Sequence, residues 1–186
     1  MRLYIAGPLF TPYHRAFHSE NVRRLREAGH KCFVPQEQEH NKQREAIRQA
    51  GGAPSEGFDV RLAEAVFEVD MIGVRGANAV VALLDDPDVS SGTSCEMGIF
   101  YELALHNPAK KGILGILTDE RPRLRDAGGV GESINFFTLG CVLKRGAIYP
   151  SVEGVIEHLA RWQEELEREG VLREGSEDDA LSQYFR

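Results

Sequence analysis

The chain has 186 residues, which fits one domain with a single sizeable core. Its hydrophobic fraction of 42% and charged fraction of 27% are ordinary for a soluble globular protein. The formal charge of −7 argues against polymeric nucleic acid as a partner, because duplex DNA needs a basic surface. No apolar run approaches the roughly 20 residues of a membrane-spanning helix, and the N-terminal MRLYIAGPLF lacks a signal-peptide pattern. We therefore expect a cytoplasmic protein with no membrane partner.

Cysteine and histidine spacing gives no sign of a metal or redox centre. Cys32, Cys95 and Cys141 are far apart, so neither a disulfide framework nor a CxxC site is suggested. His14 and His18 share one predicted helix face, but no third ligand or HExxH pattern accompanies them. Nucleotide-cofactor loops such as GxxxxGK[ST] are also missing. We expect no cofactor and no metal.

Apolar runs alternate with helical periodicity along most of the chain. In chain order, the predicted elements are a strand at 2–6, a helix at 15–28, a strand at 31–34, a short helix near 41–50, a helix at 59–74, a strand at 78–84, a helix at 93–106, a strand at 112–117, a short helix at 134–140, a strand at 141–144 and a helix at 151–169. We expect residues 1–169 to form one catalytic domain and the acidic residues 170–186 to form a tail.

Strands that alternate with helices predict an α/β fold with a central, mostly parallel sheet. The run NAVVALL before Asp85 is nearly all apolar, as expected of a central strand covered on both faces. In such sheets ligands bind beyond the carboxyl ends of the strands. Three predicted loops leave those ends, at 7–13, 85–92 and 118–133. The chemistry is therefore expected in these loops.

The segment DDPDVSSGTSCEMG, residues 85–98, places carboxylates, hydroxyls and a glycine between a buried strand and a helix start. Hydroxyls and first-turn N–H groups suit a phosphate or a ribose. Glu96, expected in that first turn, suits attack on a sugar carbon, because a nearby anion stabilises or traps an oxocarbenium-like state. A structural alternative exists, since Thr93-Ser-Cys-Glu96 also fits a capping box. From spacing alone, capping is favoured over catalysis.

Two further side chains border the predicted apolar surface. Asp70 follows Val66 and Phe67 at helical spacing, so its carboxyl can have a raised pKa and donate a proton to a leaving base. Pattern alone favours an exposed acid at a helix end. Tyr4 lies in the first strand, where a core role is favoured, although a phenol near a strand end can orient a carboxylate.

Three segments resemble motifs of the nucleoside 2-deoxyribosyltransferase family. They are LYIAGPLF at the N-terminus, AVVALLDDPDVSSGTSCEMG in the middle and INFF further on. The family typically shows an apolar strand ending in AGP, a D-x-x-x-I segment and LDG followed by DSGTxxEhG, where h is apolar. The match runs in consistent order over about 3–145, and the central motif is specific.

The resemblance implies a flavodoxin-like three-layer sandwich and a double displacement without a cofactor. Glu96 matches the nucleophile, Asp70 in DMIGV matches the aspartate that helps protonate the leaving base, and Tyr4 matches the tyrosine that hydrogen-bonds the nucleophile. The implied partners are a 2'-deoxynucleoside or deoxynucleotide and a free nucleobase. A homo-oligomer with active sites shared between subunits is also implied. The implied substrate-binding residues are Gly7, Phe10, Asp88, Ser90, Gly92 and Asn135, the last reaching a neighbouring subunit's site.

Two departures from the family pattern bear on the substrate. Transferases usually have an aspartate where this chain has Ser90, a residue similar to that of the related 2'-deoxynucleoside 5'-monophosphate N-hydrolases. A hydroxyl there removes repulsion against a 5'-phosphate, whereas Asn135 resembles the transferases. Asp86 stands where LDG usually has glycine, a change that bears on the loop backbone. Deoxyribosyl transfer is the leading hypothesis, 5'-monophosphate hydrolysis is the alternative, and a non-catalytic nucleotide-binding sensor is third.

Overall fold

The computed structural model describes residues 1–39, 60–86, 89–119, 134–172 and 180–186. Its strands are β1 (Arg2–Ala6), β2 (Lys31–Phe33), β3 (Ala79–Leu83), β4 (Gly112–Ile116) and β5 (Ala147–Tyr149). They form one sheet in the order β2-β1-β3-β4-β5, and every pair is parallel. This is the flavodoxin-like strand order. The predicted α/β class and flavodoxin-like architecture are confirmed.

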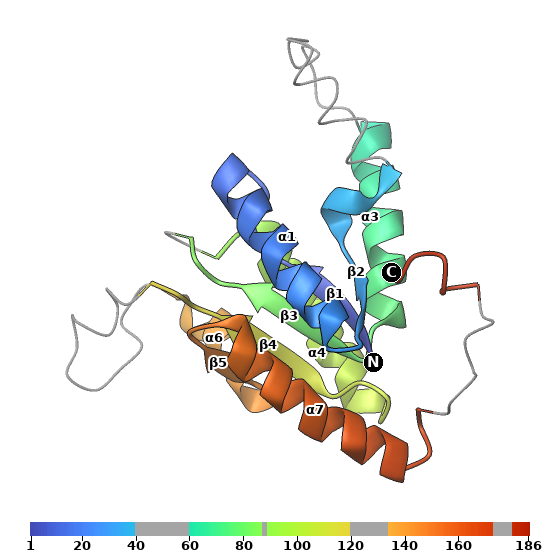
Figure 1. Ribbon diagram of the computed structural model, residues 1–186. Coiled ribbons are helices and arrows are strands. Elements are labelled where there is room, and N and C mark those ends of the chain that lie inside the picture. The colour runs from blue at the N-terminus through green and yellow to red at the C-terminus, as the bar shows by residue number, and fades with distance from the viewer. Residues whose placement is uncertain (40–59, 87–88, 120–133, 173–179) are drawn as a thin grey trace.

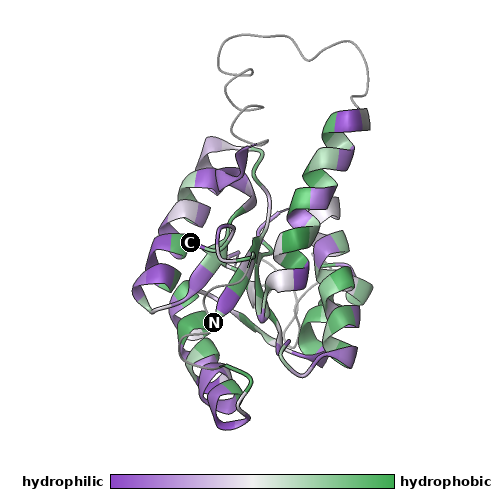
Figure 2. Cartoon of the chain, turned by 90° about the vertical axis from the view of Figure 1, so that its right-hand side faces the viewer, coloured by the Kyte–Doolittle hydropathy of each residue, from purple (hydrophilic) through white to green (hydrophobic). Residues whose placement is uncertain are grey.

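The helices cover both faces of the sheet (Figures 1 and 2). They are α1 (Pro12–Glu27), α3 (Val60–Gly76), α4 (Ser91–His106), α6 (Phe136–Lys144) and α7 (Val152–Arg168), with a short 3-10 turn, η1 (Pro35–Glu37). One core cluster lies between the sheet and α1 and α7, and the other lies between the sheet and α3, α4 and α6. Strand alternation divides β1 between them, because Leu3 and Ile5 face α1 whereas Tyr4 faces α3 and α4. Among the described residues, no helix is long and apolar enough to cross a membrane.

The helix that covers 136–144 corrects the sequence prediction for this part of the chain. A strand was predicted at 141–144, but these residues continue α6, and the edge strand β5 follows at Ala147–Tyr149. Helix α6 begins after Asn135, whose side chain accepts hydrogen bonds from the N–H groups of Phe137 and Thr138. The prediction failed because a short apolar run has no clear period, and a three-residue strand shows no alternation.

The start of α1 also differs from the prediction. The helix begins at Pro12 rather than at residue 15, because the Thr11 hydroxyl accepts a hydrogen bond from the His14 N–H at 3.0 Å. Threonine followed by proline is a typical helix start. The short helix predicted near 41–50 lies outside the described residues. The three loops expected to hold the chemistry leave the same edge of the sheet. Of the loop at 118–133, only residues 118–119 are among the described residues.

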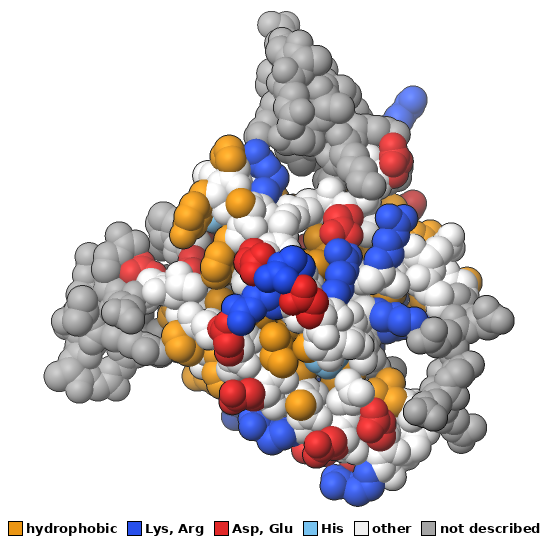
Figure 3. Space-filling view, viewed as in Figure 1, with side chains coloured by type: hydrophobic (Ala, Val, Ile, Leu, Met, Phe, Trp, Pro, Cys, Tyr) orange, Lys and Arg blue, Asp and Glu red, His pale blue; other side chains and the backbone are white. Residues whose placement is uncertain are grey.

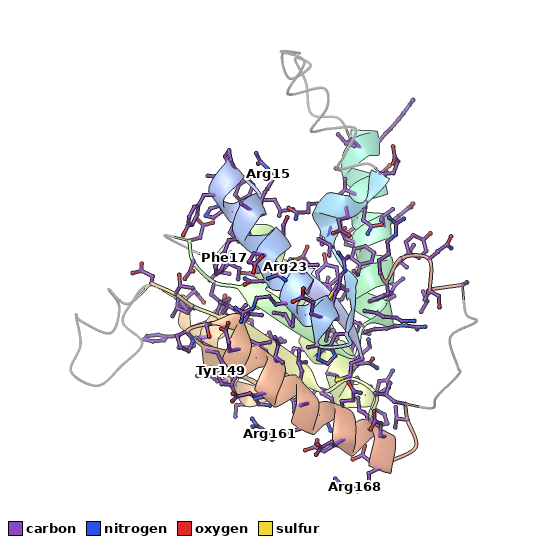
Figure 4. The ribbon with its side chains drawn as sticks, in the orientation of Figure 1. Arg15, Phe17, Arg23, Tyr149, Arg161 and Arg168 are labelled. Atoms are coloured by element: carbon purple, nitrogen blue, oxygen red, sulfur yellow. The ribbon has the colours of Figure 1, made fainter. Side chains whose placement is uncertain are left out.

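The outer face of α1 and α7 carries interleaved charges of both signs (Figures 3 and 4). Arg23 pairs with Glu20 and Glu27 on α1, and Arg24 pairs with Glu153 across to α7. Exposed pairs of this kind contribute little stability, because water and salt screen their charges. Their mixed sign gives this face no continuous basic surface for nucleic acid.

Candidate active site

Tyr4 and Glu96 lie together beneath the carboxyl edge of the sheet. The Tyr4 hydroxyl donates a hydrogen bond of 2.8 Å to Glu96 Oε1, although 92 positions separate the two residues. Tyr4 is fully buried in β1, and Glu96 comes from α4. The capping-box interpretation of Glu96 is wrong, as is its placement in the first turn. Ser90 is the N-cap, so Thr93 lies inside the helix and Glu96 stands in the second turn.

Burial gives Glu96 an unusual affinity for a proton. It raises the pKa of the Glu96 carboxyl to about 7, and the charge of Asp70 adds to the rise, while the Tyr4 hydrogen bond opposes it. Burial together with the two neighbouring carboxylates raises the pKa of Tyr4, so that its phenol stays neutral and keeps donating. Near neutral pH the Glu96 side chain is therefore present in both its protonated and its ionised form.

Asp70 lies in the second half of α3, a helix that packs against α4. Its Oδ1 atom is buried and has no hydrogen-bond partner within the described part of the chain. Burial raises the pKa of the Asp70 carboxyl to about 6, which favours the proton-donor interpretation over the exposed acid that pattern alone favoured. Two carboxyls with raised pKa values, one of which raises the pKa of the other through its charge, are typical of acid–base and nucleophilic sites.

The N-terminus of α4 forms a second part of the candidate site. Ser90 caps the helix without a side-chain hydrogen bond to the cap, and a side chain added at Gly92 would meet no atom within 4 Å. Open space therefore lies beside the first turn, where free N–H groups and the helix dipole favour an anion. Asp88, also predicted to bind substrate, lies outside the described residues.

The loop after β1 lies tightly against α1 at Gly7. This residue has a φ of +150°, and a Cβ there would lie 2.4 Å from His18 Nε2 and 2.9 Å from Leu83 Cβ. His18 is buried, so its ring cannot swing away. Only glycine fits this backbone path. Phe10, three residues on, is 67% exposed at the same edge of the sheet.

The family model of the nucleoside 2-deoxyribosyltransferases matches residues 3–143 of this chain. The chain belongs to the nucleoside 2-deoxyribosyltransferase family. Its fold is similar to that of a conserved protein from Enterococcus faecalis V583, with 20% identity, a TM-score of 0.62 and coverage of 87% of this chain and 98% of that one. A 2-deoxyribosyltransferase from Bacillus psychrosaccharolyticus is similar at 20% identity, with a TM-score of 0.55 and coverage of 84% and 90%. No curated protein matches the sequence significantly.

This family consists of enzymes that act on the glycosidic bond of small nucleosides, and its motifs converge in the structure. The match confirms the resemblance drawn from the three motifs. Tyr4 and Glu96, from the first and central motifs, are in direct contact. Asn135, from the third, is exposed and caps α6, a helix that packs against α4.

A cavity of about 250 Å³ opens at the same edge of the sheet, on the side of α1. Its walls come from α1 and from the loops after β3 and β4, and its lining residues are Tyr13, His14, Phe17, Leu83, Asp85, Asp86, Thr118 and Asp119. In Figure 4, Phe17 projects from α1 on the side of these loops. The carboxylate of Asp85 joins the two loops by accepting hydrogen bonds from the N–H groups of Thr118 at 2.7 Å and Asp119 at 3.1 Å. None of Tyr4, Asp70 and Glu96 is part of this lining.

Two residues that support the site were not singled out from the sequence. Phe33 stacks on Tyr4 with ring centroids 5.4 Å apart. Tyr4 and Phe33 are paired residues in the register of β1 and β2. The sequence of a three-residue strand does not predict its register. Lys110 is buried and donates hydrogen bonds to the carbonyls of Arg75 and Ala77 at the end of α3, at 2.7 Å each. A lysine in a polar loop carries no sequence signal for such a cap.

Proposed function

We propose that this chain is a nucleoside 2-deoxyribosyltransferase that cleaves the N-glycosidic bond of 2'-deoxynucleosides and passes the sugar to another nucleobase. The observation that carries the proposal is the partly buried hydrogen bond between Tyr4 and Glu96, with the charge of Asp70 raising the pKa of both. Membership in the family supports the reaction class. A protein that only binds nucleotides does not need a carboxylate held by a tyrosine beside a second carboxyl, so this pair argues against a non-catalytic sensor.

In the first step, a Glu96 carboxylate oxygen attacks C1' of the sugar while the bond from C1' to the base breaks. Tyr4 holds Oε1, so Oε2 is the oxygen left to attack. Asp70 in its protonated form gives its proton to the departing base nitrogen. The products are a deoxyribosyl ester on Glu96, a free base and an Asp70 carboxylate.

In the second step, a nitrogen of the incoming base attacks C1' and the Glu96 oxygen leaves as a carboxylate. Asp70 takes the proton that the incoming base loses, which restores the starting enzyme. Each step inverts C1', so the product keeps the configuration of the substrate. The transition state of each step has oxocarbenium character, which the half-buried Glu96 stabilises by proximity.

The remaining predicted residues are proposed to bind substrate around this centre. Phe10 offers an exposed aromatic face to a nucleobase. Gly7 and Gly92 keep side chains away from the sugar. Asn135 is proposed to reach the 5' end of the sugar in a neighbouring subunit, which makes the enzyme a homo-oligomer. The side chains next to it support an interface, because Phe136 is 75% exposed and Phe137 is 89% exposed.

Ser90 favours a second candidate, hydrolysis of 2'-deoxynucleoside 5'-monophosphates. Its hydroxyl makes no side-chain capping bond and stands at the positive end of α4. A serine there accepts a 5'-phosphate that an aspartate would repel. In this reaction water takes the place of the incoming base in the second step.

One assay distinguishes transfer from hydrolysis. The enzyme is incubated with deoxyadenosine, deoxycytidine and their 5'-monophosphates, with and without free adenine. Exchange of bases that depends on added adenine is the result expected for the transferase. Free base released only from the monophosphates, at a rate that adenine does not change, would overturn transfer in favour of hydrolysis.

Replacing Tyr4 with phenylalanine is expected to lower kcat by about 10–100-fold. A hydrogen bond to a charged group contributes roughly 1.5–3 kcal/mol, and the loss of that energy from the transition state corresponds to this decrease in rate. The hydrogen bond lowers the pKa of Glu96, so its loss raises that pKa and moves the limb of the pH–rate profile near pH 7 to higher pH. Steady-state rates across pH test this. Tyr101→Phe, at a half-buried tyrosine of α4 that packs against the same core cluster, is the matched control and leaves the profile unchanged. A Tyr4→Phe enzyme with normal kcat and profile would contradict the role of Tyr4.

The pH profile of kcat/KM is expected to be bell-shaped and narrow. The pKa of Asp70 is about 6 and that of Glu96 is about 7, so the singly protonated pair carries its proton mainly on Glu96. Turnover uses the minor form of that pair, in which Asp70 holds the proton and Glu96 is the nucleophile. Below about pH 6 the second proton blocks attack, and above about pH 7 no proton remains for the leaving base. Asp70→Asn removes the alkaline limb and lowers the rate. A flat profile between pH 5 and 9 is inconsistent with this pair.

A further inference from the structure

The last residues of the chain return to the sheet at its β2 edge. The backbone N–H of Cys32 donates to an oxygen of Arg186 at 2.8 Å, and the N–H of Arg186 donates to the Cys32 carbonyl at 3.2 Å. Arg26 Nε also donates to an Arg186 oxygen at 2.8 Å. Figure 1 shows this C-terminal end beside α3. These bonds fix residues 180–186, the C-terminal segment, at a sheet edge that otherwise offers unpaired groups.

Phe185 extends from this segment into the core that contains the candidate site. It is 3% exposed and belongs to the same cluster as Tyr4 and Phe33. Its ring centroid lies 5.8 Å from that of Phe33, and Phe33 stacks on Tyr4 at 5.4 Å with 21° between the ring planes. Tyr4 in turn holds Glu96. An unbroken row of contacts thus runs from the C-terminus to the proposed nucleophile.

Both phenylalanines also lie directly on α3, the helix of Asp70. A Cβ at Gly73 would lie 2.5 Å from the Phe33 ring, and a Cβ at Gly76 would lie 2.9 Å from the Phe185 ring. The two glycines lie three residues apart, on one face of the helix. Their missing side chains leave the space that the two rings occupy. The C-terminal segment therefore packs against the helix that carries Asp70 and against the Phe33 ring that stacks on Tyr4.

We propose that the C-terminal segment is a positioning element for catalysis, with Phe185 acting through Phe33 to hold the Tyr4 hydroxyl on Glu96. The inference rests on the proposed role of Glu96. The phenol makes a single directional hydrogen bond, and its ring is fully buried, so the packing on its face sets where the hydroxyl points. Removing Phe185 leaves Phe33 without its support on one side.

The test is a double-mutant cycle between Phe185→Ala and Tyr4→Phe, with kcat and KM measured for each variant. Phe185→Ala alone is expected to lower kcat by roughly tenfold and to change KM by less than about twofold, because small misplacements near a reacting group are costly. In the Tyr4→Phe background the same substitution is expected to lower kcat by less than about twofold, since the hydroxyl that it positions is gone.

A core substitution on the opposite face of the sheet is the matched control. Leu159→Ala, on α7, removes a fully buried side chain in the other cluster and is expected to change kcat little in either background. All variants are assayed at a temperature where circular dichroism shows them folded. If Phe185→Ala does not fold, Phe185→Leu takes its place in the cycle.

Two outcomes overturn the inference. One is an equal loss of kcat from the Phe185 variant in both backgrounds, and the other is a loss no greater than that of Leu159→Ala. Neither outcome affects the proposed function, which fails separately if Glu96→Gln keeps its turnover.

Discussion

Glu96→Gln is expected to lower turnover of 2'-deoxynucleosides by at least about 10⁴-fold, because an amide cannot form the sugar ester. The substitution keeps the size of the side chain and an oxygen for the Tyr4 hydroxyl, so the fold of the site is retained. Initial rates of base release measure the effect. Glu102→Gln is the matched control, since Glu102 lies on the same helix, is exposed and pairs only with His106 among the described residues. Turnover of Glu96→Gln above about 1% of wild type would exclude Glu96 as the nucleophile.

The same variant is expected to be more stable than wild type at alkaline pH. Burial raises the pKa of Glu96 from 4.5 to about 7, so the folded state prefers the protonated carboxyl. That preference stabilises the fold below pH 4.5 and is lost as the pH rises to about 7. A neutral glutamine avoids the loss, which for this shift is at most about 3 kcal/mol. Thermal unfolding at pH 8 and pH 5 tests the sign, and a variant less stable than wild type at pH 8 would show that Glu96 is stabilised as an anion.

Gly7→Ala is expected to destabilise the protein by about 3–5 kcal/mol, because the added methyl group has no room and the backbone conformation disfavours alanine. The new Cβ would stand 2.4 Å from His18 Nε2 and 2.9 Å from Leu83 Cβ, and the φ of +150° is unfavourable for alanine. Overpacking and backbone strain each cost about 1–3 kcal/mol. For a chain of this length, each kcal/mol lowers Tm by roughly 2–4 °C.

Two companion variants separate the causes of the Gly7 effect. Gly98→Ala adds the same methyl group to α4, where a Cβ meets no atom within 4 Å, and is expected to raise stability by up to about 1 kcal/mol. Gly7→Ala combined with His18→Ala removes the ring that clashes and is expected to recover part of the loss. Calorimetric scans give all three values. A Gly7→Ala protein with the Tm of wild type would show that the loop moves freely away from α1.

The sequence predicted the architecture well because the buried strands are distinctive. The apolar run at β3 and the Gly7-Pro8 breaker after β1 mark the two central strands, and helical spacing marks the long helices. The edge of the sheet was harder to predict. The strand β5 has only three residues, and the apolar residues of α6 fit either period. Local patterns cannot decide such cases, which tertiary packing resolves.

The candidate site shows a different limit of the sequence. Spacing favoured Glu96 as a cap and Tyr4 as a core residue, because nothing local shows that residues 92 positions apart touch. The resemblance to the family brought them together. It gave no hint of Phe185, which lies beyond the matched residues 3–143 and contacts the Phe33 ring that stacks on Tyr4. A single phenylalanine in a polar segment has no periodic partner that would predict its burial.

The most direct test of the double displacement is to look for a deoxyribosyl group bound to the protein. The enzyme is mixed with deoxyadenosine in the absence of an acceptor base, quenched rapidly with acid, digested and analysed by mass spectrometry. If Glu96 is the nucleophile, the peptide containing it carries one deoxyribosyl group, located on that residue, and the same peptide of Glu96→Gln carries none. A deoxyribosyl group on another residue, or turnover with inversion at C1' and no labelled peptide, would contradict this mechanism.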